Sequence, residues 1–377
     1  MSASPLSKSG AGASLRHVLG HLVTPLLMCV GMGLAYLGAF HAPEPHQLRV
    51  DVVGSGPSAQ VLAQTLHDKG EGALDVRTVT DRAQARAQLL DRQVYGAYVP
   101  GEKPELMVAT AGSDTTATVV QKVFTKVAAE QGEPLKVTDV APVSAGDPTG
   151  QGLFFLLVAL SIGSYASVAV IGGAGAVLPL RIRALLAAGM SLVVSGIGAV
   201  FAGPLFHLVD QGLPGVWAMS WIYSAGILLI GVGLHTFLKR WTTLGVMVLF
   251  VMLNFTSSGG IFRPELQSGF FAALHSFWNG AGFIEGARGH VYFDGNGVGR
   301  SVLVLTLWFV AGLAVMGAAG LFEAARRRRV APGAHAAHAH PAHGVPAGSE
   351  VADDRAASSG RSAPAETEEE LEEAVGV

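Results

Sequence analysis

The sequence predicts an α-helical polytopic membrane protein of about six transmembrane helices, with an extracytoplasmic α/β domain inserted between the first and second helices. Two compositional features lead to this prediction. Of the 377 residues, 50% are hydrophobic and only 14% are charged, whereas soluble domains carry about 25% charged residues. Several apolar runs also approach or exceed the roughly 20 residues that a helix needs to cross a bilayer. The polar stretch 41–150 separates the first run from the others.

The first apolar run spans residues 18–40 and follows a short N-terminal segment, 1–17, that carries Lys8 and Arg16. A cleaved signal peptide is the alternative, but the apolar core of such a peptide is usually only about 7–15 residues long. We therefore expect an uncleaved transmembrane anchor after a cytoplasmic N-terminus. The single cysteine, Cys29, has no disulfide partner, and we expect it to pack as a small apolar residue.

Residues 41–150 alternate between strand-like and helix-like patterns. Asp81 stands where it caps a helix, and Gly70 stands where another helix ends. This alternation predicts a small α/β domain of about a hundred residues, which is large enough for its own core. The predicted strands are 48–53, 73–79, 94–100, 105–110 and 135–140, and the predicted helices are 57–70, 81–92 and 114–132.

The remaining apolar runs lie within a predicted five-helix transmembrane domain, 151–325, at about 152–177, 184–209, 216–237, 243–261 and 301–322. Basic residues occur in the connections 178–183 and 238–241 and after the last run, but not in 210–215. The positive-inside rule then places both termini in the cytoplasm and the α/β domain outside. We expect a multi-pass protein of a plasma membrane, surrounded by membrane lipids.

The last segment, 326–377, is low in complexity and is predicted to be a disordered cytoplasmic tail. A His-rich stretch precedes an acidic one, ETEEELEE. The histidines could bind a metal, but a flexible His-rich tail does so weakly, so we favour a solvated tail and expect no metal site. These histidines are His335, His338, His340 and His343.

No catalytic motif stands out. The stretch VDVVGSGPSA resembles a dinucleotide fingerprint, with Gly54 and Gly56 and an alanine at the third position, but Asp75 begins its strand where the fingerprint needs an acidic residue at a strand's end. We expect these glycines to form a tight turn instead. The sequence lacks the P-loop pattern, H-E-x-x-H and G-x-S-x-G. We therefore expect no enzyme, no cofactor in this chain and no nucleic-acid partner, and any ATP chemistry would need another chain.

Residues 258–300 follow an apolar run and begin with a polar patch. Pro264 suits a helix's first turn, and Glu265 suits the positive end of the helix dipole. Leu266, Phe270 and Phe271 fall at spacings that, with Leu274, make one apolar face. Two such short pieces, within 262–298, predict a helical dip into the outer leaflet, covered by protein or facing water. An external loop with an interfacial helix is the alternative.

This pattern resembles the permease subunits of type-2 ABC exporters, including the related YhgE/Pip (phage infection protein) membrane family. The resemblance in architecture covers residues 15–325, and the most specific stretch is NFTSSGGIFRPELQSGFFAALHSFWNGAGFIEGAR. The sequence departs from the family where Ser268 and Gly269 replace a second proline, and where SFWNG replaces another. The matching residues are Asn254, Ser257, Ser258, Gly259, Gly260, Pro264, Glu265, Leu266, Phe270, Phe271, Leu274 and Arg288.

The resemblance implies a translocation path that is opened by a separate ATPase. Two such permease subunits would pair as a homodimer or heterodimer, and two ATPase subunits would bind at the cytoplasmic side of a bacterial plasma membrane. Arg181 and Arg183 would lie in a cytoplasmic loop that contacts the ATPase, and the motif from Asn254 to Arg288 would shape the exit. A scaffold subunit of a secretion or cell-envelope assembly, binding partners through its extracytoplasmic domain, is the alternative function.

Overall fold

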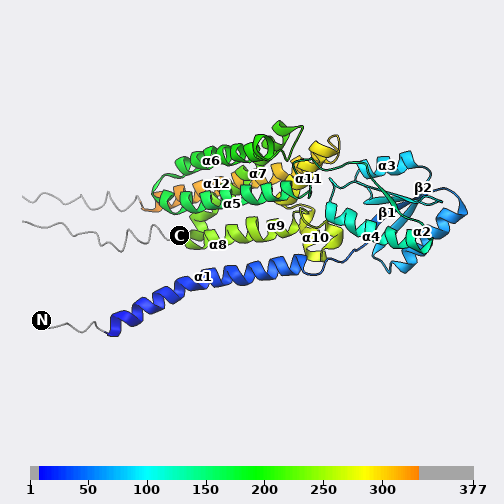
Figure 1. Cartoon of the computed structure of the whole chain (residues 1–377). Coiled ribbons are helices and arrows are strands. Elements are labelled where there is room, and N and C mark those ends of the chain that lie inside the picture. The colour runs from blue at the N-terminus through cyan, green and yellow to red at the C-terminus, as the bar shows by residue number, and fades with distance from the viewer. Residues whose placement is uncertain (1–7, 331–377) are drawn as a thin grey trace, which may run out of the picture.

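The computed structural model describes residues 8–330 and divides them into a helical domain and a small α/β domain at one end of it (Figure 1). The first helix, α1 (Lys8–Phe40), leads into the α/β domain, and the chain then returns to form the remaining helices. The predicted tail beyond residue 330, with its histidines and its acidic stretch, lies outside the described residues.

The α/β domain contains the five predicted strands and three predicted helices. Its sheet has the order β2-β1-β3-β4-β5, in which only the β3–β4 pair is antiparallel. Side chains alternate between the two faces of a strand, and each face has its own apolar core. Helices α2 and α4 cover one face, and α3 covers the other. The elements are β1 (Leu48–Val53), α2 (Pro57–Lys69), β2 (Leu74–Val79), α3 (Arg82–Leu90), β3 (Gly96–Val99), β4 (Glu105–Val108), α4 (Asp114–Glu130) and β5 (Lys136–Asp139).

Local signals set the helix ends in this domain. The Asp81 side chain accepts a hydrogen bond from the backbone N–H of Gln84 at 2.8 Å, which caps α3 as predicted. Helix α2 ends at Lys69, and Gly70 follows at its C-cap. Gly54 has φ of +140° in the turn between β1 and α2, a value that favours glycine.

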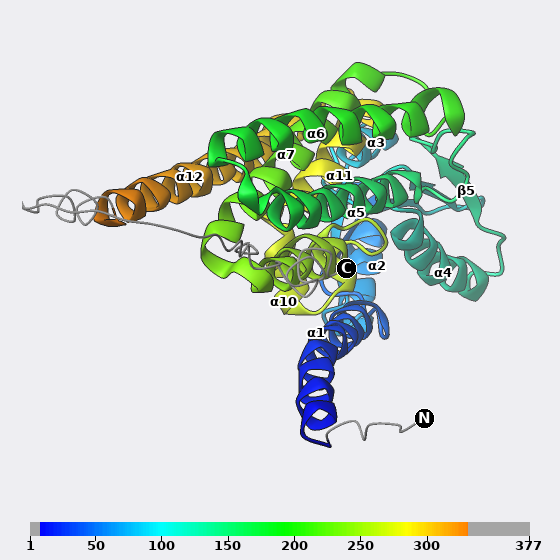
Figure 2. The ribbon, with the colours of Figure 1, turned by 90° about the vertical axis from the view of Figure 1, so that its left-hand side faces the viewer.

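The helical domain is built around α7, whose middle is buried on every side. Helices α5, α6, α11 and α12 pack against α7, whereas α1 contacts α9 and the π-helical turn Val248–Met252. After a turn of 90°, α1 is seen at the edge of the bundle, with its N-terminal part projecting away from the other helices (Figure 2). The helices are α5 (Gly152–Gly172), α6 (Leu180–Val200), α7 (Leu213–Leu238), α8 (Thr242–Met247), α9 (Leu253–Ser257), α10 (Gly269–His275), α11 (Asn279–Tyr292) and α12 (Val298–Val330).

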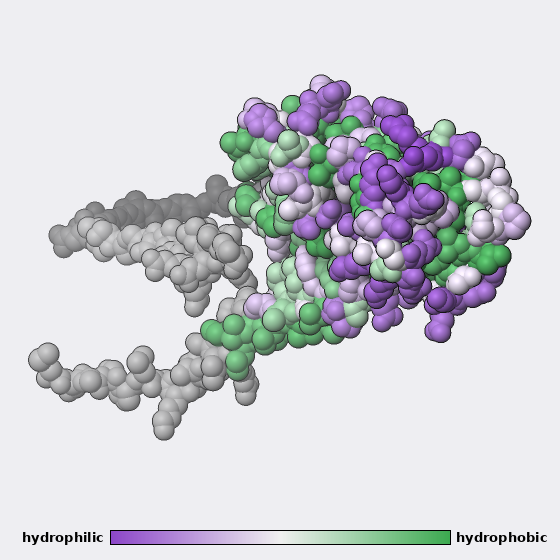
Figure 3. Space-filling model, turned by 45° about the vertical axis from the view of Figure 1, so that its right-hand side comes forward, coloured by the Kyte–Doolittle hydropathy of each residue, from purple (hydrophilic) through white to green (hydrophobic). Residues whose placement is uncertain are grey.

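Five helical stretches in the described chain are long and apolar enough to cross a membrane. The fourth, Leu213–Ser257, contains the predicted run 216–237 and most of the predicted run 243–261, which ends four residues earlier than predicted. It bends at the 3-10 turn Lys239–Trp241, where Lys239 has φ of +48°, and α8 and α9 then run back toward the α/β domain (Figure 1). The α/β domain has a largely hydrophilic surface, whereas α1 exposes apolar side chains along much of its length (Figure 3). These features are those of a membrane-embedded protein with a polar domain outside the bilayer.

Two predicted boundaries differ from the structure. Helix α6 begins at Leu180, so Arg181 and Arg183 lie in its first turn rather than in a loop, because Pro179 directly precedes the helix and is followed by good helix formers. Helix α12 continues through Arg326–Arg329 to Val330, past the predicted boundary at residue 325. A run of arginines has high helix propensity, and cations are favoured at a helix C-terminus.

Candidate functional site

The motif around Asn254 lies inside the helical domain, where it joins α9 to α5, α7 and α11. Asn254 is fully buried, and its Oδ1 accepts a hydrogen bond from the backbone N–H of Gly280 at 2.6 Å. Its Nδ2 donates to the hydroxyl of Tyr223 on α7, which also bonds to Ser161 on α5. The first N–H groups of a helix have no partner within that helix. The Asn254 side chain on α9 therefore gives the Gly280 N–H, at the start of α11, the acceptor that it lacks within its own helix.

The polar patch after Asn254 forms a tight buried turn rather than an exposed loop. Ser257 and Ser258 donate to backbone carbonyls of α9, and the Ser258 hydroxyl also accepts from the N–H of Gly260 at 3.1 Å. Gly259 has φ of +72°, which favours glycine. A Cβ atom on Gly260 would lie 2.3 Å from the ring of Phe154. The two glycines are therefore required by close packing against α5 and α10.

Arg288 holds this turn from α11. It is almost fully buried, and its guanidinium donates to the carbonyl oxygens of Gly259 at 2.8 Å and Gly260 at 3.0 Å. Hydrogen bonds from a charged donor are about twice as strong as neutral ones. The structure thus brings the predicted Arg288 and the paired glycines into direct contact, although they are 28 and 29 residues apart.

Glu285, one turn before Arg288 on α11, is the centre of a charge network that sequence reasoning missed. Its carboxylate pairs with Arg263 from the segment after α9 and with Arg92 from the α/β domain, and it lies 3.5 Å from Arg288. Arg92 also donates to the Glu285 backbone carbonyl at 3.3 Å. We name this set, Arg92, Arg263, Glu285 and Arg288, the junction network.

The junction network is stabilised by its own charges. Burial alone would raise the pKa of the Glu285 carboxyl, but the positive charges of Arg263 and Arg92 outweigh burial and hold this pKa well below its usual value. His275 faces the same region from α10, its Nδ1 bonds to the Ser257 carbonyl at 2.9 Å, and burial lowers its pKa. Glu285 is therefore ionised and His275 is neutral at pH 7.

Pro264 and Glu265 form a 3-10 turn, Pro264–Leu266, that lies against the α/β domain. The Glu265 carboxylate is 3.6 Å from Arg49 on β1, and its backbone carbonyl accepts from the N–H of His46 at 2.7 Å. The structure thus gives Glu265 a basic partner in the other domain. The helix α10 begins five residues after Pro264, at Gly269, so the expected single helix is split in two. The cause is the extended backbone at Gln267 and Ser268.

The paired aromatics that follow point in different directions. Phe271 is buried, and its ring approaches Gly38 of α1, whereas Phe270 is 61% exposed. Adjacent helical residues do not share a face, so the predicted apolar face includes Phe271 but not Phe270. This contact ties α10 to the first helix.

The arginines expected to contact an ATPase lie at the opposite end of the helical domain. Arg181 is exposed, whereas Arg183 is buried and its Nη2 lies 2.5 Å from Glu323 on α12. Arg183 therefore joins α6 to α12 and is not available at the surface. Only Arg181 of the predicted pair can meet a partner.

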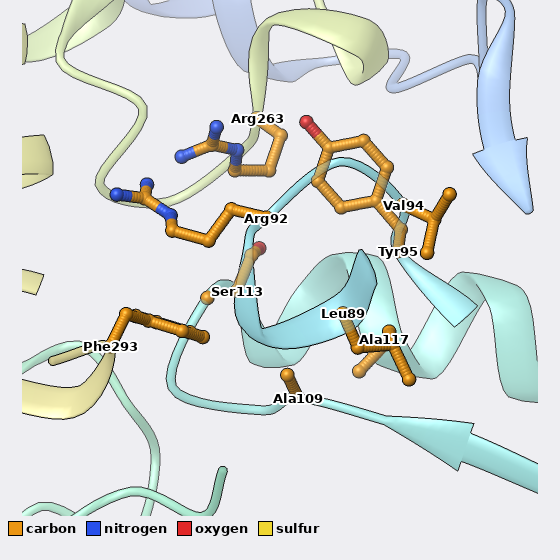
Figure 4. Close-up of a pocket in the computed structure, with 10 residues that line it drawn as sticks. Leu89, Arg92, Val94, Tyr95, Ala109, Ser113, Ala117, Arg263 and Phe293 are labelled. Carbon is orange, nitrogen blue, oxygen red and sulfur yellow. The ribbon is translucent and has the colours of Figure 1, made fainter. Parts of the chain in front are cut away.

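A small cavity lies where the α/β domain meets the helical domain (Figure 4). The side chains of Arg92 and Arg263 run side by side along it, and their guanidinium groups point away from Leu89 and Ala117. Tyr95 and Phe293 complete two walls, and Arg92 lies over the Phe293 ring at 5.3 Å. Cation–π contacts of this kind add to the ion pairs at the junction.

The arrangement links three parts of the fold. Within residues 8–330, no group of three or more His, Cys, Asp or Glu side chains is placed to hold a metal ion. The junction network instead connects the α/β domain, the glycine turn and α11 through charged hydrogen bonds. Glu285 and Arg288, three residues apart in an otherwise apolar stretch, were the sequence signal for it.

No family model matches this chain, and neither a curated protein nor a solved structure shows a significant match to it.

Proposed function

We propose that this chain is the membrane-spanning permease subunit of an ABC-type exporter, and that it forms the translocation path for export driven by a separate ATPase subunit. One observation is the main support for this proposal. The basic helix ends, at Arg181, Lys239–Arg240 and Arg326–Arg329, lie at one end of the helical domain, and the α/β domain lies at the other (Figure 1). Such a charge asymmetry is typical of an oriented membrane protein with its basic end in the cytoplasm.

In this proposal the protein crosses the bacterial plasma membrane six times, with both termini inside. The two arms of Leu213–Ser257 count as separate spans, because α7 alone has 26 residues and a span needs about 20. The turn Ser257–Gly260 and helices α10 and α11 then lie at the outer end, as the part of the path from which cargo leaves. ATP acts through partner subunits, which bind the basic end, and a second permease subunit completes the path.

The junction network suggests how the outer end works in this proposal. Arg92 binds the α/β domain to Glu285, and Arg288 binds the same helix to the glycine turn. A movement of α11 therefore carries the α/β domain and the turn with it. A rigid connection of this kind allows a change at the spans to reach the external domain.

A scaffold subunit is the second candidate. The firm docking of the α/β domain favours it as well, because a docked domain presents a fixed surface to partners. The edge strand β5 is mostly exposed, with Val137 38% exposed, and such edges can accept another strand. The scaffold needs no ATPase, whereas the exporter does.

Co-purification with a candidate ABC ATPase, followed by ATP turnover in lipid, separates the two functions. We expect Arg181→Glu to weaken ATPase binding and Arg86→Glu, an exposed arginine on α3, to leave it unchanged. If the purified protein retains no ATPase, and its deletion alters neither export nor resistance, the exporter function is wrong and the scaffold remains.

The topology has its own test. In a Cys29→Ala background, cysteines introduced at Asp114 and at Ala347 are treated with a membrane-impermeant thiol reagent in intact cells. We expect labelling at position 114 only, because α4 belongs to the external domain in this orientation. Labelling at position 347 alone would reverse the proposed orientation.

A further inference from the structure

Three helix ends meet at the end of the helical domain that faces away from the α/β domain. The first turn of α6 is joined to α12 by Arg183 and Glu323, at 2.5 Å. The last turn of α7 reaches the same place, since the rings of Phe237 and Phe322 lie with centroids 5.4 Å apart and Thr236 donates to Glu323 at 3.5 Å. The residues next to these contacts, at the start of α6 and after the contacts on α7 and α12, therefore lie at the same end of the helical domain.

These neighbouring ends carry an excess of positive charge. Within the described stretches 173–183, 235–245 and 318–330, Glu323 is the sole acidic residue, and it already pairs with Arg183. The other basic residues are exposed and form no ion pair with the described acidic groups. We name them the basic face: Arg181, Lys239, Arg240, Arg326, Arg327, Arg328 and Arg329.

A cluster of unpaired cations attracts a polyanion, and this chain carries one. The segment 366–373, ETEEELEE, holds six glutamates among eight residues and no basic residue. It belongs to the same polypeptide that leaves the helical domain at the end of α12, within the basic face itself. Charge complementarity over several residues gives an attraction that individual exposed ion pairs do not.

We propose that the acidic segment 366–373 binds the basic face of its own chain. The length of chain available permits this. From Arg329 to Glu366 there are 37 residues, and even a random coil of that length has a root-mean-square span of only about 33 Å. A tethered segment within such reach experiences an effective concentration on the order of millimolar, so weak contacts suffice.

The contact does not depend on the orientation in the membrane, because the tail continues from α12 and must lie on the same side as the basic face. It has a consequence for partners, since Arg181 belongs to this face. A bound acidic segment covers the surface that an ATPase would use. The tail would therefore act as a built-in competitor, displaced by a partner that binds more tightly.

A peptide-binding measurement tests the proposal on full-length protein. A fluorescently labelled peptide of residues 364–377 is titrated with two purified proteins in nonionic detergent, and its anisotropy is followed. One protein is the unaltered chain. In the other, the glutamine-tail protein, glutamine replaces all six glutamates of 366–373. We expect the glutamine-tail protein to bind the peptide at least about 10-fold more tightly, because its basic face is not occupied by its own tail.

Two further comparisons make the result decisive. Raising the salt from about 0.05 M to about 0.5 M should weaken binding strongly, since exposed charges are screened over a few ångströms at high salt. In the glutamine-tail protein, changing Arg326–Arg329 to glutamine should reduce binding by at least about 10-fold, whereas Arg86→Gln on α3 should not. Circular dichroism checks that both variants keep their helical content.

Three outcomes would overturn the proposal. Equal peptide affinity for the unaltered and glutamine-tail proteins would show that the tail does not occupy the face. Unchanged affinity after loss of the four arginines would show that the peptide binds elsewhere. If binding persists in nanodiscs of zwitterionic lipid but disappears in nanodiscs with about 30% anionic lipid, the face is a headgroup site in the membrane and not a tail site. None of these outcomes involves an ATPase, so each is independent of the exporter function.

Discussion

Asp51 offers a quantitative test of the α/β domain, because its carboxylate is buried without a partner. It lies on β1 between Arg77 of β2 and Ala97 of β3, on the sheet face that α3 covers. Its side chain is 0% exposed, and neither of its oxygens accepts a hydrogen bond. A buried ionised carboxylate without partners is costly, so Asp51→Asn, which removes the charge and keeps the shape, should stabilise the domain.

The size of the effect follows from the pKa. Burial is the main cause that raises the pKa of Asp51 from 3.8 to about 6, and the nearby charge of Arg77 reduces this rise only partly. Between these two values the folded protein holds a proton that the unfolded chain has released, so stability falls as pH rises through that window. A shift of about two units corresponds to about 3 kcal/mol. Asp51→Asn should therefore match the unaltered protein near pH 3.5 and be about 3 kcal/mol more stable above pH 7.

Urea unfolding followed by pulse proteolysis measures this, because the five tryptophans all lie outside residues 41–150 and their fluorescence does not report on this domain. Cleavage within the domain is quantified in detergent at several pH values between 3.5 and 8. Asp68→Asn, at an exposed site on α2, serves as the matched control and should change stability by less than about 0.5 kcal/mol. If the gain from Asp51→Asn is the same at both ends of the pH range, or if the variant is the less stable at pH 8, the reasoning is refuted.

Two further changes test the junction. Glu285→Gln leaves the buried Arg288 and the partly buried Arg92 and Arg263 without their shared carboxylate and should cost about 3–5 kcal/mol, seen as protease cleavage between the two domains at lower urea; unchanged cleavage would mean that the junction network does not hold the domains together. Gly260→Val should destabilise the helical domain by about 1–3 kcal/mol, because the valine side chain would overlap the Phe154 ring. Gly317→Ala in α12 has open space and should be neutral or slightly stabilising in the same urea and proteolysis assay; equal effects of the two would contradict the packing argument.

The candidate site was predicted in part. Asn254, the paired glycines and Arg288 follow from the motif; in the structure Arg288 donates to both glycine carbonyls, and Asn254 accepts from Gly280 on the same helix as Arg288. Glu285 was missed, because the nearby Arg288 gives no indication that Arg92 and Arg263, both distant in the sequence, pair with the same carboxylate. Its ion pair with Arg92 joins residues 193 positions apart. No periodic pattern encodes a pairing of that range.

The sequence by itself determined the elements and the apolar runs. The strands and helices of the α/β domain follow from alternation, from the cap at Asp81 and from Gly70, because these interactions act within a few residues. Only the tertiary structure decided which charges meet. Arg183 was expected at the surface but is buried with Glu323, while Arg181, two positions away, stays exposed. The physical reason is that burial and ion pairing depend on which helix faces pack together, and the packing of helices distant in the chain is set by the whole fold.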